Sequence, residues 1–575
     1  MGKILRFLKN DWWKIALILA LTFAQSMANL YLPAYMSEIV NIGIPTGDTL
    51  FILKTGGIML AVALSGIICQ IIARYTSANV SAKFSADLRD AVFTKVECFS
   101  LSEFDKFSTA SLITRCTNDV SHVQRFFDII LRMAITAPMM SIGGIIMAVR
   151  YGQGLSWILV IASIAIVAVM SLNFVFTVPK FNQMQANIDR LNLTAREGLS
   201  GIRVIRAFNA QKTQDSKFND ANVTLTKLHL VIGRIMSVLQ PLTIFIMNIT
   251  TVVALWLGAS LVAKSSIQVG DLMAFIQYIM QILFSFQMLS MMFIIFPRAM
   301  VSVKRINEVL DTQPGIRDPS ESDRKSPEST GTIEFRDVTF TYPGALEPAL
   351  NNISFTAKPD QMTAIIGSTG SGKTTLANLI PRLYDVTKGT VYVDGVDVRQ
   401  FSTHDLRSRI GYVPQKSMMF SGNIESNISF GRDISHEEVV RSANIAQASD
   451  FINETENGFK HSIAQGGVNI SGGQKQRLSI ARALADSPKI YIFDDSFSSL
   501  DFQTESNLKN ALAEKTLNST VILITQRVST IMNADQIIVL DAGKVVGMGK
   551  HNDLLKTCKV YYEIASSQLT KEELV

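Results

Sequence analysis

Apolar residues form six long runs in the first half of the chain. They lie at about 15–34, 51–73, 129–149, 155–176, 236–262 and 272–296. A helix rises about 1.5 Å per residue, so about 20 residues cross the roughly 30 Å hydrocarbon core of a bilayer. The pattern therefore predicts an α-helical membrane domain over residues 1–310, with six spans and both ends on one side of the membrane.

The positions of the cations predict which side that is. The connections at about 74–128 and 177–235 are rich in Lys and Arg, whereas those at 35–50, 150–154 and 263–271 carry at most one each. Cation-rich loops stay in the cytoplasm, so both termini are expected there. Each long connection has helical periodicity, which predicts two helical arms joined by a short cross-piece.

A change of composition follows the last span. Pro314–Thr330 is polar, rich in Pro and Ser and without periodicity, which predicts a linker over residues 311–330. The 575-residue chain has 48% hydrophobic and 18% charged residues, and its net charge of +6 divides into +11 up to residue 310 and −5 after it. A basic excess confined to the apolar half is typical of a membrane protein, and without a long basic run it argues against nucleic acid as a partner.

The four cysteines are widely scattered and form no CxxC pair. Neither a zinc cluster nor a disulfide framework is therefore expected, and the cysteines are interpreted as packing residues.

The second domain, residues 331–575, contains a glycine-rich loop. This loop follows the apolar run Met362–Ile366 and precedes a helix-like apolar segment, which is the strand–loop–helix order of a phosphate-binding P-loop. Lys373 would reach the β- and γ-phosphates of ATP, and the Thr374 hydroxyl could ligate Mg²⁺. The predicted ATP-binding residues of this α/β domain are Gly367, Ser368, Thr369, Gly370, Ser371, Gly372, Lys373, Thr374 and Thr375.

Two further positions fit the same chemistry. Asp494 ends the apolar strand Ile490–Phe493, which places a carboxylate where a P-loop ATPase needs its second contact to magnesium. Ser471 can cap a helix whose Gly472 and Gly473 leave their amides open, which makes a second anion-binding helix start without its own lysine.

These motifs resemble those of the ATP-binding cassette (ABC) transporters, specifically exporter half-transporters with six spans fused to one nucleotide-binding domain. The resemblance covers essentially the whole chain and implies that the signature residues Ser471, Gly472, Gly473 and Gln474, with Asp501 of the D-loop, contact ATP held by a second subunit. It also implies that Tyr342 stacks on adenine and that Gln415 touches Mg²⁺ beside Thr374 and Asp494. The segments from Phe104 and from Gly201 resemble the coupling helices that dock on nucleotide-binding domains.

Two positions depart from the family pattern. Asp495 stands where the family has the general-base glutamate, and Gln526 stands where it has the switch histidine. Aspartate is one methylene shorter, about 1.5 Å, and a misplacement of about 1 Å can lose about 10²-fold in rate. Glutamine cannot carry a proton as imidazole does. We therefore expect this site to bind ATP but to be hydrolytically impaired.

The resulting hypothesis is an ATP-driven, multi-pass exporter subunit of a bacterial inner membrane, with its nucleotide-binding domain in the cytoplasm. A degenerate site beside a near-normal signature motif resembles heterodimeric multidrug exporters, so the expected partner is a half-transporter with an intact Glu and His. The methionine- and phenylalanine-rich segment Tyr278–Phe293 suits lipophilic substrates. Two alternatives remain open: export of a lipid or lipopeptide, and a nucleotide-sensing regulatory membrane subunit that transports nothing itself.

Overall fold

In the computed structural model, residues 2–570 are described, apart from the side chains of residues 182 and 290–294. The chain divides into two compact units. The first comprises the residues up to Glu97 and Thr109–Thr312, and the second comprises Cys98–Ser108 together with the residues from Gln313 onward. The cross-piece between the first two long helical arms therefore belongs with the C-terminal residues.

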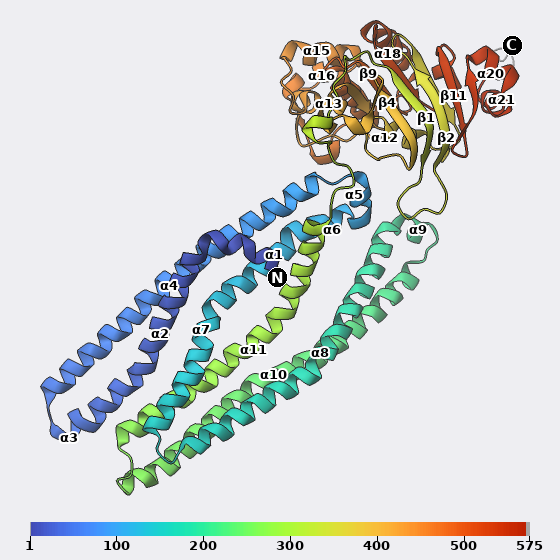
Figure 1. Ribbon diagram of the computed structural model, residues 1–575. Coiled ribbons are helices and arrows are strands. Elements are labelled where there is room, and N and C mark those ends of the chain that lie inside the picture. The colour runs from blue at the N-terminus through green and yellow to red at the C-terminus, as the bar shows by residue number, and fades with distance from the viewer. Residues whose placement is uncertain (1, 571–575) are drawn as a thin grey trace. The chain divides into compact units, whose positions relative to one another are not determined.

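The first unit consists of long helices (Figure 1). Their bounds are α1 Gly2–Leu5, η1 Arg6–Asp11, α2 Trp12–Glu38, η2 Ile39–Gly43, α3 Ile44–Thr46, α4 Thr49–Glu97, α6 Thr109–Thr114, η3 Arg115–Asp119, α7 Val120–Tyr151, α8 Ser156–Ser200, α9 Ile202–Ala207, α10 Gln211–Ala263 and α11 Val269–Asp311. Six helical segments among the described residues are long and apolar enough to cross a membrane, which confirms the predicted number of spans. Several helices exceed the length of a span because the predicted helical arms continue them without a break.

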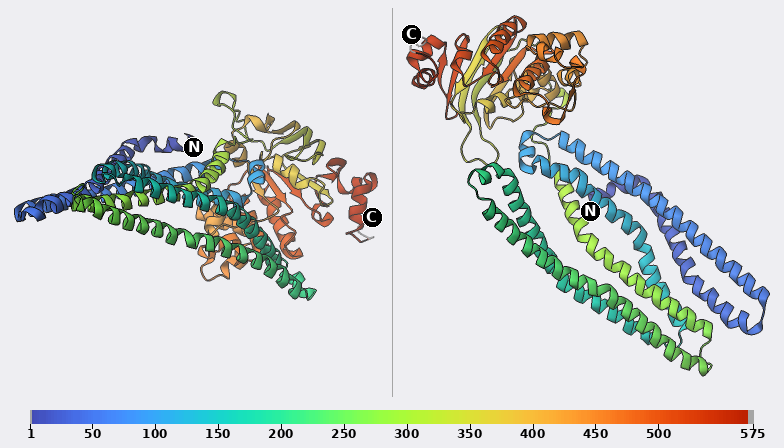
Figure 2. Two further views of the ribbon diagram at one scale, coloured as in Figure 1. Left: turned by 90° about the horizontal axis from the view of Figure 1, so that it is seen from below. Right: turned by 180° about the vertical axis from the view of Figure 1, so that it is seen from behind.

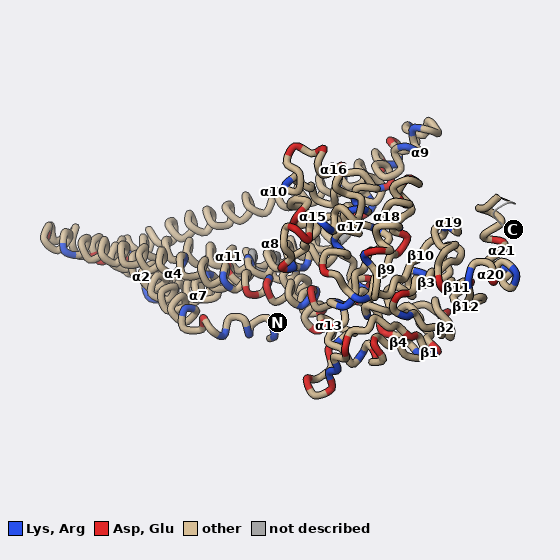
Figure 3. The backbone as a smooth tube through the Cα atoms, turned by 90° about the horizontal axis from the view of Figure 1, so that it is seen from above, with Lys and Arg blue, Asp and Glu red and all other residues tan. Residues whose placement is uncertain are grey.

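The long helices run in antiparallel pairs (Figures 1 and 2). The pairs are α2 with α4, α7 with α11, and α8 with α10. Charged residues are sparse along much of these helices (Figure 3). Between 11% and 44% of each apolar window is buried inside the protein, so most apolar side chains there are available to lipid.

Hydrogen bonds between the spans satisfy some of the polar groups that they contain. The Tyr278 hydroxyl donates to the Leu30 carbonyl over 2.8 Å, which links α11 to α2. The hydroxyls of Ser141 and Ser285 lie 2.6 Å apart between α7 and α11. Such polar contacts help spans to associate where both protein and lipid are apolar.

The second unit is an α/β domain together with one short helix that precedes it in the sequence. That helix is α5 Leu101–Phe107. The strands are β1 Ile333–Phe340, β2 Leu350–Ala357, β3 Met362–Gly367, β4 Lys388–Val393, β5 Val396–Asp397, β6 Ile410–Val413, β7 Gly422–Asn423, β8 Ser462–Ile463, β9 Ile490–Asp494, β10 Thr520–Ile524, β11 Gln536–Asp541 and β12 Lys544–Gly549. The helices are η4 Glu321–Asp323, α12 Lys373–Leu379, η5 Val398–Gln400, α13 Thr403–Ser408, α14 Ile424–Ser429, α15 His436–Ile445, α16 Ser449–Asn453, η6 Gly458–Lys460, η7 Gln465–Gly467, α17 Gly472–Leu484, α18 Phe502–Lys515, α19 Val528–Ile531, α20 His551–Thr557 and α21 Lys559–Ser566.

Two sheets form the frame of this unit. An antiparallel sheet has the order β2-β1-β4-β5, and a six-stranded sheet has the order β12-β11-β3-β10-β9-β6. In the larger sheet β11, β3, β10, β9 and β6 are parallel, and β12 is antiparallel to β11. Parallel sheets are covered on both faces, and here Ile365 joins one apolar core while Ala364 and Ile366 join the other.

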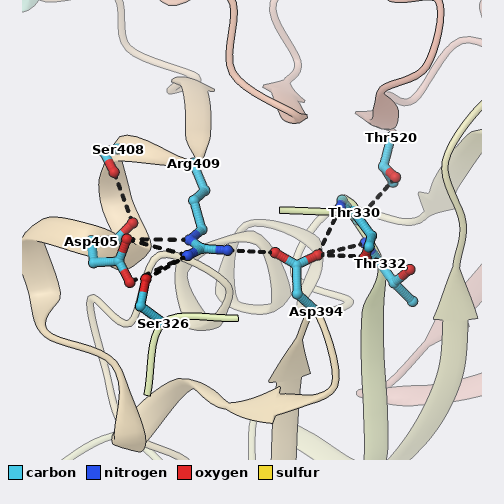
Figure 4. A network of polar contacts seen from close by, with 9 residues as sticks. Ser326, Thr330, Thr332, Asp394, Asp405, Ser408, Arg409 and Thr520 are labelled. Atoms are coloured by element: carbon cyan, nitrogen blue, oxygen red, sulfur yellow. Dashed lines mark hydrogen bonds and ion pairs between the residues drawn. The ribbon is translucent and has the colours of Figure 1, made fainter. Parts of the chain in front are cut away.

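A buried ion pair between Arg409 and Asp394 connects the start of the second domain to both sheets (Figure 4). The Arg409 guanidinium lies 3.0 Å from an Asp394 carboxylate oxygen, and their side chains are 9% and 0% exposed. Arg409 also contacts Asp405, while the other Asp394 oxygen accepts the backbone amides of Gly331 and Thr332 at 2.6 and 3.1 Å. Asp394 is therefore almost fully satisfied without water.

Replacing Asp394 by Ala should destabilise the second unit markedly. The substitution leaves a buried guanidinium and two amides without their acceptor, which costs about 3 kcal/mol. For a domain of this size the melting temperature should fall by roughly 6 °C or more, measured by scanning calorimetry of the purified full-length chain. The control is Glu334→Gln, which breaks the largely exposed pair with Arg336. Equal melting temperatures for the two variants would contradict the importance of the buried pair.

Candidate nucleotide-binding site

The parallel strands place four predicted segments at one edge of the large sheet. β3 leads into the glycine loop, β9 ends at Asp494, β10 leads to Gln526, and β6 leads to Gln415. A cavity of about 340 Å³ lies at this edge. It is lined by Tyr342, Ala349, Thr369, Gly370, Gly372, Lys373, Thr374, Thr375, Gln415, Asp494, Asp495, Ile524, Thr525 and Gln526.

The glycine loop has a backbone that requires glycine. Gly370 and Gly372 have φ angles of +82° and +98°, in the left-handed region that L side chains rarely adopt. A Cβ atom on Gly372 would also lie 2.7 Å from a Leu350 methyl carbon and 2.9 Å from the Ala349 carbonyl oxygen. The loop therefore packs tightly against the start of β2, and its amides remain available for phosphate.

Lys373 is buried beneath this loop at the start of α12. Its ammonium donates to the carbonyls of Gly367 and Ser368 at 2.8 and 2.7 Å. Burial lowers the pKa of Lys373, and the nearby Asp494 and Asp495 carboxylates oppose that shift. A partly desolvated cation held by neutral carbonyls is well suited to bind the negative charge of a triphosphate.

The residues predicted to hold magnesium lie together. The Thr374 hydroxyl is 3.3 Å from one Asp494 oxygen, and Gln415 lines the same cavity. Asp494 is 1% exposed, and its other oxygen has no hydrogen-bond partner within residues 2–570. Burial raises the pKa of Asp494, as does the neighbouring Asp495, whereas the bond from Thr374 lowers it. An unpaired buried carboxylate oxygen beside a hydroxyl fits Mg²⁺ bound together with phosphates and water.

Residues 2–570 contain no cluster of side chains that could bind a metal ion without ligands from another molecule. No group of three His, Cys, Asp or Glu side chains among the described residues could hold an ion by itself, and the four described cysteines form no disulfide with one another. Since Mg²⁺ usually takes only one or two carboxylates and completes its shell with phosphates, the arrangement is consistent with a metal that arrives with nucleotide.

Both departures from the family pattern face this cavity. Asp495 is half-buried, adopts a φ of +49°, and donates its backbone amide to the Ile524 carbonyl over 2.9 Å. Gln526 lies on the exposed rim, and its carbonyl accepts a 2.8 Å hydrogen bond from the Gln568 side chain. The next residue, Arg527, donates to the Ser498 carbonyl over 2.8 Å, which connects this rim to the D-loop.

Tyr342 lies on another wall of the cavity. Its hydroxyl is 2.9 Å from that of Thr375, and its ring meets the Phe340 ring edge-on with centroids 4.8 Å apart. Ala349, Ile524 and Thr525 also line the cavity but were not singled out from the sequence. Thr525 could have been found as the residue that follows β10, whereas the approach of Ala349 depends on sheet packing.

The signature residues lie outside this cavity. Ser471 caps α17 by accepting the Gln474 amide over 3.3 Å, and the Gln474 side chain accepts the Ser471 amide over 2.8 Å. Ser471 and Gly472 are exposed. The Gln476 side chain accepts the Ser499 amide at 3.1 Å, so α17 and the D-loop are held together.

Asp501 has a local structural role as well. It caps α18 by accepting the Thr504 amide over 2.9 Å, and this backbone bond lowers the pKa of its carboxyl. None of Ser471, Gly472, Gly473, Gln474 and Asp501 is among the residues lining the described cavity. The structure thus brings most of the predicted P-loop residues together with the predicted magnesium, adenine and catalytic-position residues, and keeps the signature and D-loop residues out of this cavity. Of the predicted P-loop residues, Gly367, Ser368 and Ser371 do not line the cavity.

Comparisons with known proteins find matches to both units of the chain. Residues 15–286 match the ABC transporter transmembrane region and residues 350–498 match the ABC transporter family. The chain is 41% identical over 559 residues, 96% of each protein, to an uncharacterized ABC transporter ATP-binding protein of Mycobacterium tuberculosis. It is 36% identical over 578 residues, 100% of this chain and 99% of the relative, to one of Bacillus subtilis. The structure of a bacterial Atm1-family ABC exporter with ATP bound has the same fold, with a TM-score of 0.80, 24% identity, and coverage of 98% of this chain and 99% of that one.

Substitution of Lys373 by Ala should weaken ATP binding at least about tenfold, because it removes the buried cation from the phosphate cradle. The measurement is titration of a fluorescent ATP analogue, with Mg²⁺, against the purified full-length chain. Lys544→Ala, which removes a cation from the exposed start of β12, is the matched control. An unchanged affinity in Lys373→Ala would show that the cavity is not where ATP binds.

Proposed function

This chain belongs to the ABC transporter family, and we propose that it is one half of an exporter whose own nucleotide site binds ATP but cleaves it slowly. The observation that carries this proposal is the position of Asp495 and Gln526. Both line the cavity that also contains Lys373 and Thr374. The cavity therefore keeps the groups suited to binding a triphosphate and lacks the two side chains that the family uses to cleave it.

The proposed impairment has a physical cause at each position. Asp495 withdraws the carboxylate by about one methylene, so a water molecule held by it would lie about 1.5 Å from the required line of attack. Gln526 can donate or accept a hydrogen bond, but it cannot take up and release a proton near neutral pH. Mg²⁺, when bound with ATP, would neutralise phosphate charge beside Thr374, Gln415 and Asp494, whichever residue occupies position 495.

The exposed signature helix supports a two-chain arrangement. Ser471 and Gly472 present the N-terminus of the 13-residue helix α17 to solvent, and helix N-termini favour anions. Since these residues do not line this chain's cavity, we assign them to ATP bound by a second subunit. The partner that this assignment requires is a half-transporter with an intact catalytic Glu and His, and the pair would have one slow and one competent site.

We assign the membrane unit to outward movement of lipophilic compounds. Met273, Met280 and Phe284 on α11 are exposed, and flexible thioethers adapt to varied apolar ligands. The side chains of Met291, Met292 and Phe293, which belong to the same predicted segment, lie outside the described residues. A lipid cargo uses the same chemistry and is distinguished from a drug-like cargo by the transport assay below. The cation-rich connections and the bacterial relatives support a bacterial cell membrane with a cytoplasmic nucleotide-binding domain.

Transport would follow from different affinities for ATP in two conformations. If two nucleotide-binding domains bind ATP more tightly when they are joined than when they are apart, ATP binding favours the joined state. The shift equals the difference between the free energies of ATP binding to the two states, and the membrane helices follow it. Hydrolysis at the partner's competent site would reset the pair, while the slow site of this chain stays occupied for longer.

The purified chain alone should hydrolyse ATP slowly, and the double variant Asp495→Glu/Gln526→His should be at least about tenfold faster, because it restores the reach of the base and a titratable switch residue. Phosphate release at saturating Mg²⁺–ATP is the measurement. The same double variant carrying Lys373→Ala is the control for contaminating ATPases. Brisk turnover by the unmodified chain that Lys373→Ala abolishes would refute the slow-site proposal.

Membrane vesicles containing this chain and a half-transporter with an intact Glu and His should take up lipophilic dyes when supplied with ATP. Lys373→Ala in this chain should reduce uptake more than it reduces the ATPase rate of the pair, because it leaves the competent site complete. Movement of labelled lipid without dye would favour a lipid exporter, and ATP binding without movement of either would favour a regulatory subunit. Unchanged uptake in Lys373→Ala would refute a role for this site in coupling.

A further inference from the structure

Helix α5 is a separate, well-defined element of the second unit. Ser100 begins it with a capping box: the Glu103 carboxylate accepts the Ser100 amide over 2.8 Å. Burial raises the pKa of Glu103, but hydrogen bonds from Ser100, Ser102 and the Gly315 backbone outweigh this effect and lower it. Glu103 therefore holds the N-terminal turn of α5 and also connects it to the segment that leads into the second domain.

A second contact connects α5 to the nucleotide-binding domain. The Tyr384 hydroxyl donates to an Asp105 carboxylate oxygen over 3.2 Å, across 279 positions of the sequence. Burial and the Asp105 charge both raise the pKa of Tyr384, so the hydroxyl keeps its proton and remains a donor near neutral pH. Asp105 itself is exposed on α5, and this bond links it to the domain.

The ring of Tyr384 reaches the nucleotide cavity indirectly. It meets the Tyr342 ring edge-on, with centroids 5.5 Å apart and an interplanar angle of 85°, and it packs 5.4 Å from the Phe340 ring. Tyr342 lines the cavity, whereas Tyr384 does not. Edge-to-face pairs depend on the orientation of both rings, so a change in the plane of Tyr342 requires Tyr384 to respond.

We propose that Tyr384 is a positioning residue that transmits nucleotide occupancy from the Tyr342 side of the cavity to helix α5. This inference rests on the proposed function, because it takes Tyr342 to be the residue against which adenine stacks. Stacking would restrict the Tyr342 ring, the restricted ring would select one position of Tyr384, and the hydroxyl of Tyr384 would then stabilise one placement of Asp105. Since α5 is continuous in the chain with α4 before it and α6 after it, its placement bears on both.

The coupling must be reciprocal. If ATP favours one placement of α5, that placement must raise the affinity for ATP by the same factor. A site that cleaves ATP slowly retains it for longer than a rapidly cleaving site. The retained ATP would keep α5 in its ATP-bound placement for the lifetime of the complex. The relay needs only binding, so it can be tested on this chain without its partner.

The test is hydrogen–deuterium exchange of the full-length chain in lipid nanodiscs, with and without Mg²⁺–ATP. We expect ATP to slow exchange of the amides in residues 101–108. Tyr384→Phe keeps the ring and removes the hydroxyl, so the ATP-dependent protection should fall about threefold to tenfold. Because the coupling is reciprocal, ATP affinity should fall by no more than that same factor. Asp105→Ala should have the same effect, and the double variant should lose no more than either single variant, because both remove one bond.

Tyr392→Phe is the matched control, since it removes a tyrosine hydroxyl from β4, where the ring packs against Arg336 instead of the cavity. Full ATP-dependent protection of α5 in Tyr384→Phe would overturn the inference. So would a loss of ATP affinity in that variant much larger than the loss of protection, which would place Tyr384 in the binding site itself, or additive effects in the double variant. If Tyr384→Phe lowers the melting temperature, the exposed Asp105→Ala decides the question by the same criteria.

A separate experiment distinguishes failure of the relay from failure of the proposed function. Tyr342→Ala should lower ATP affinity markedly if its ring stacks on adenine. Unchanged affinity in that variant would refute the assigned adenine site and the relay with it. Lowered affinity in Tyr342→Ala together with unaltered protection in Tyr384→Phe would retain the site and refute the relay alone.

Discussion

The nucleotide site depends on the close packing of the glycine loop against the start of β2. At Gly372 there is no room for a side chain, because the Ala349 carbonyl and Leu350 already occupy that space. This contact holds the loop over the end of β3 and directs Lys373 back beneath it. Asp494, at the end of a neighbouring parallel strand, then lies beside Thr374. One steric constraint therefore aligns the cation, the hydroxyl and the carboxylate on which ATP binding relies.

The sequence predicts the parts of this molecule that depend on local pattern. Apolar runs long enough to cross a bilayer identify six spans, and a glycine loop between a strand and a helix identifies the P-loop. Asp494 can be predicted as a site residue because strand ends meet at one edge of a parallel sheet. The capping box of α5, Ser100 with Glu103, was not predicted, although its Ser-x-x-Glu spacing is a signal that could have found it.

Contacts between distant segments could not be predicted in the same way. Nothing in the sequence near Asp105 points to Tyr384, because the two are brought together by the packing of α5 within the second unit. Likewise, Tyr342 was expected from family resemblance, but its hydroxyl contact with Thr375 and its ring contact with Tyr384 depend on how β1 packs near α12. Side-chain partners at large sequence separation follow from tertiary packing and carry no periodic signal.

Asp495 illustrates how one residue can serve structure and limit chemistry. Its φ of +49° lies in the left-handed region, which aspartate tolerates better than longer side chains because its short polar group can hydrogen-bond locally. Aspartate therefore lowers the backbone strain of the turn after β9 relative to glutamate. Its side chain is shorter, so its carboxylate extends less far into the cavity than that of glutamate. A glutamate here would gain reach and accept more backbone strain. In the proposed function this subunit is retained for binding ATP and has no need of that reach, so a relaxed turn at Asp495 is compatible with that role.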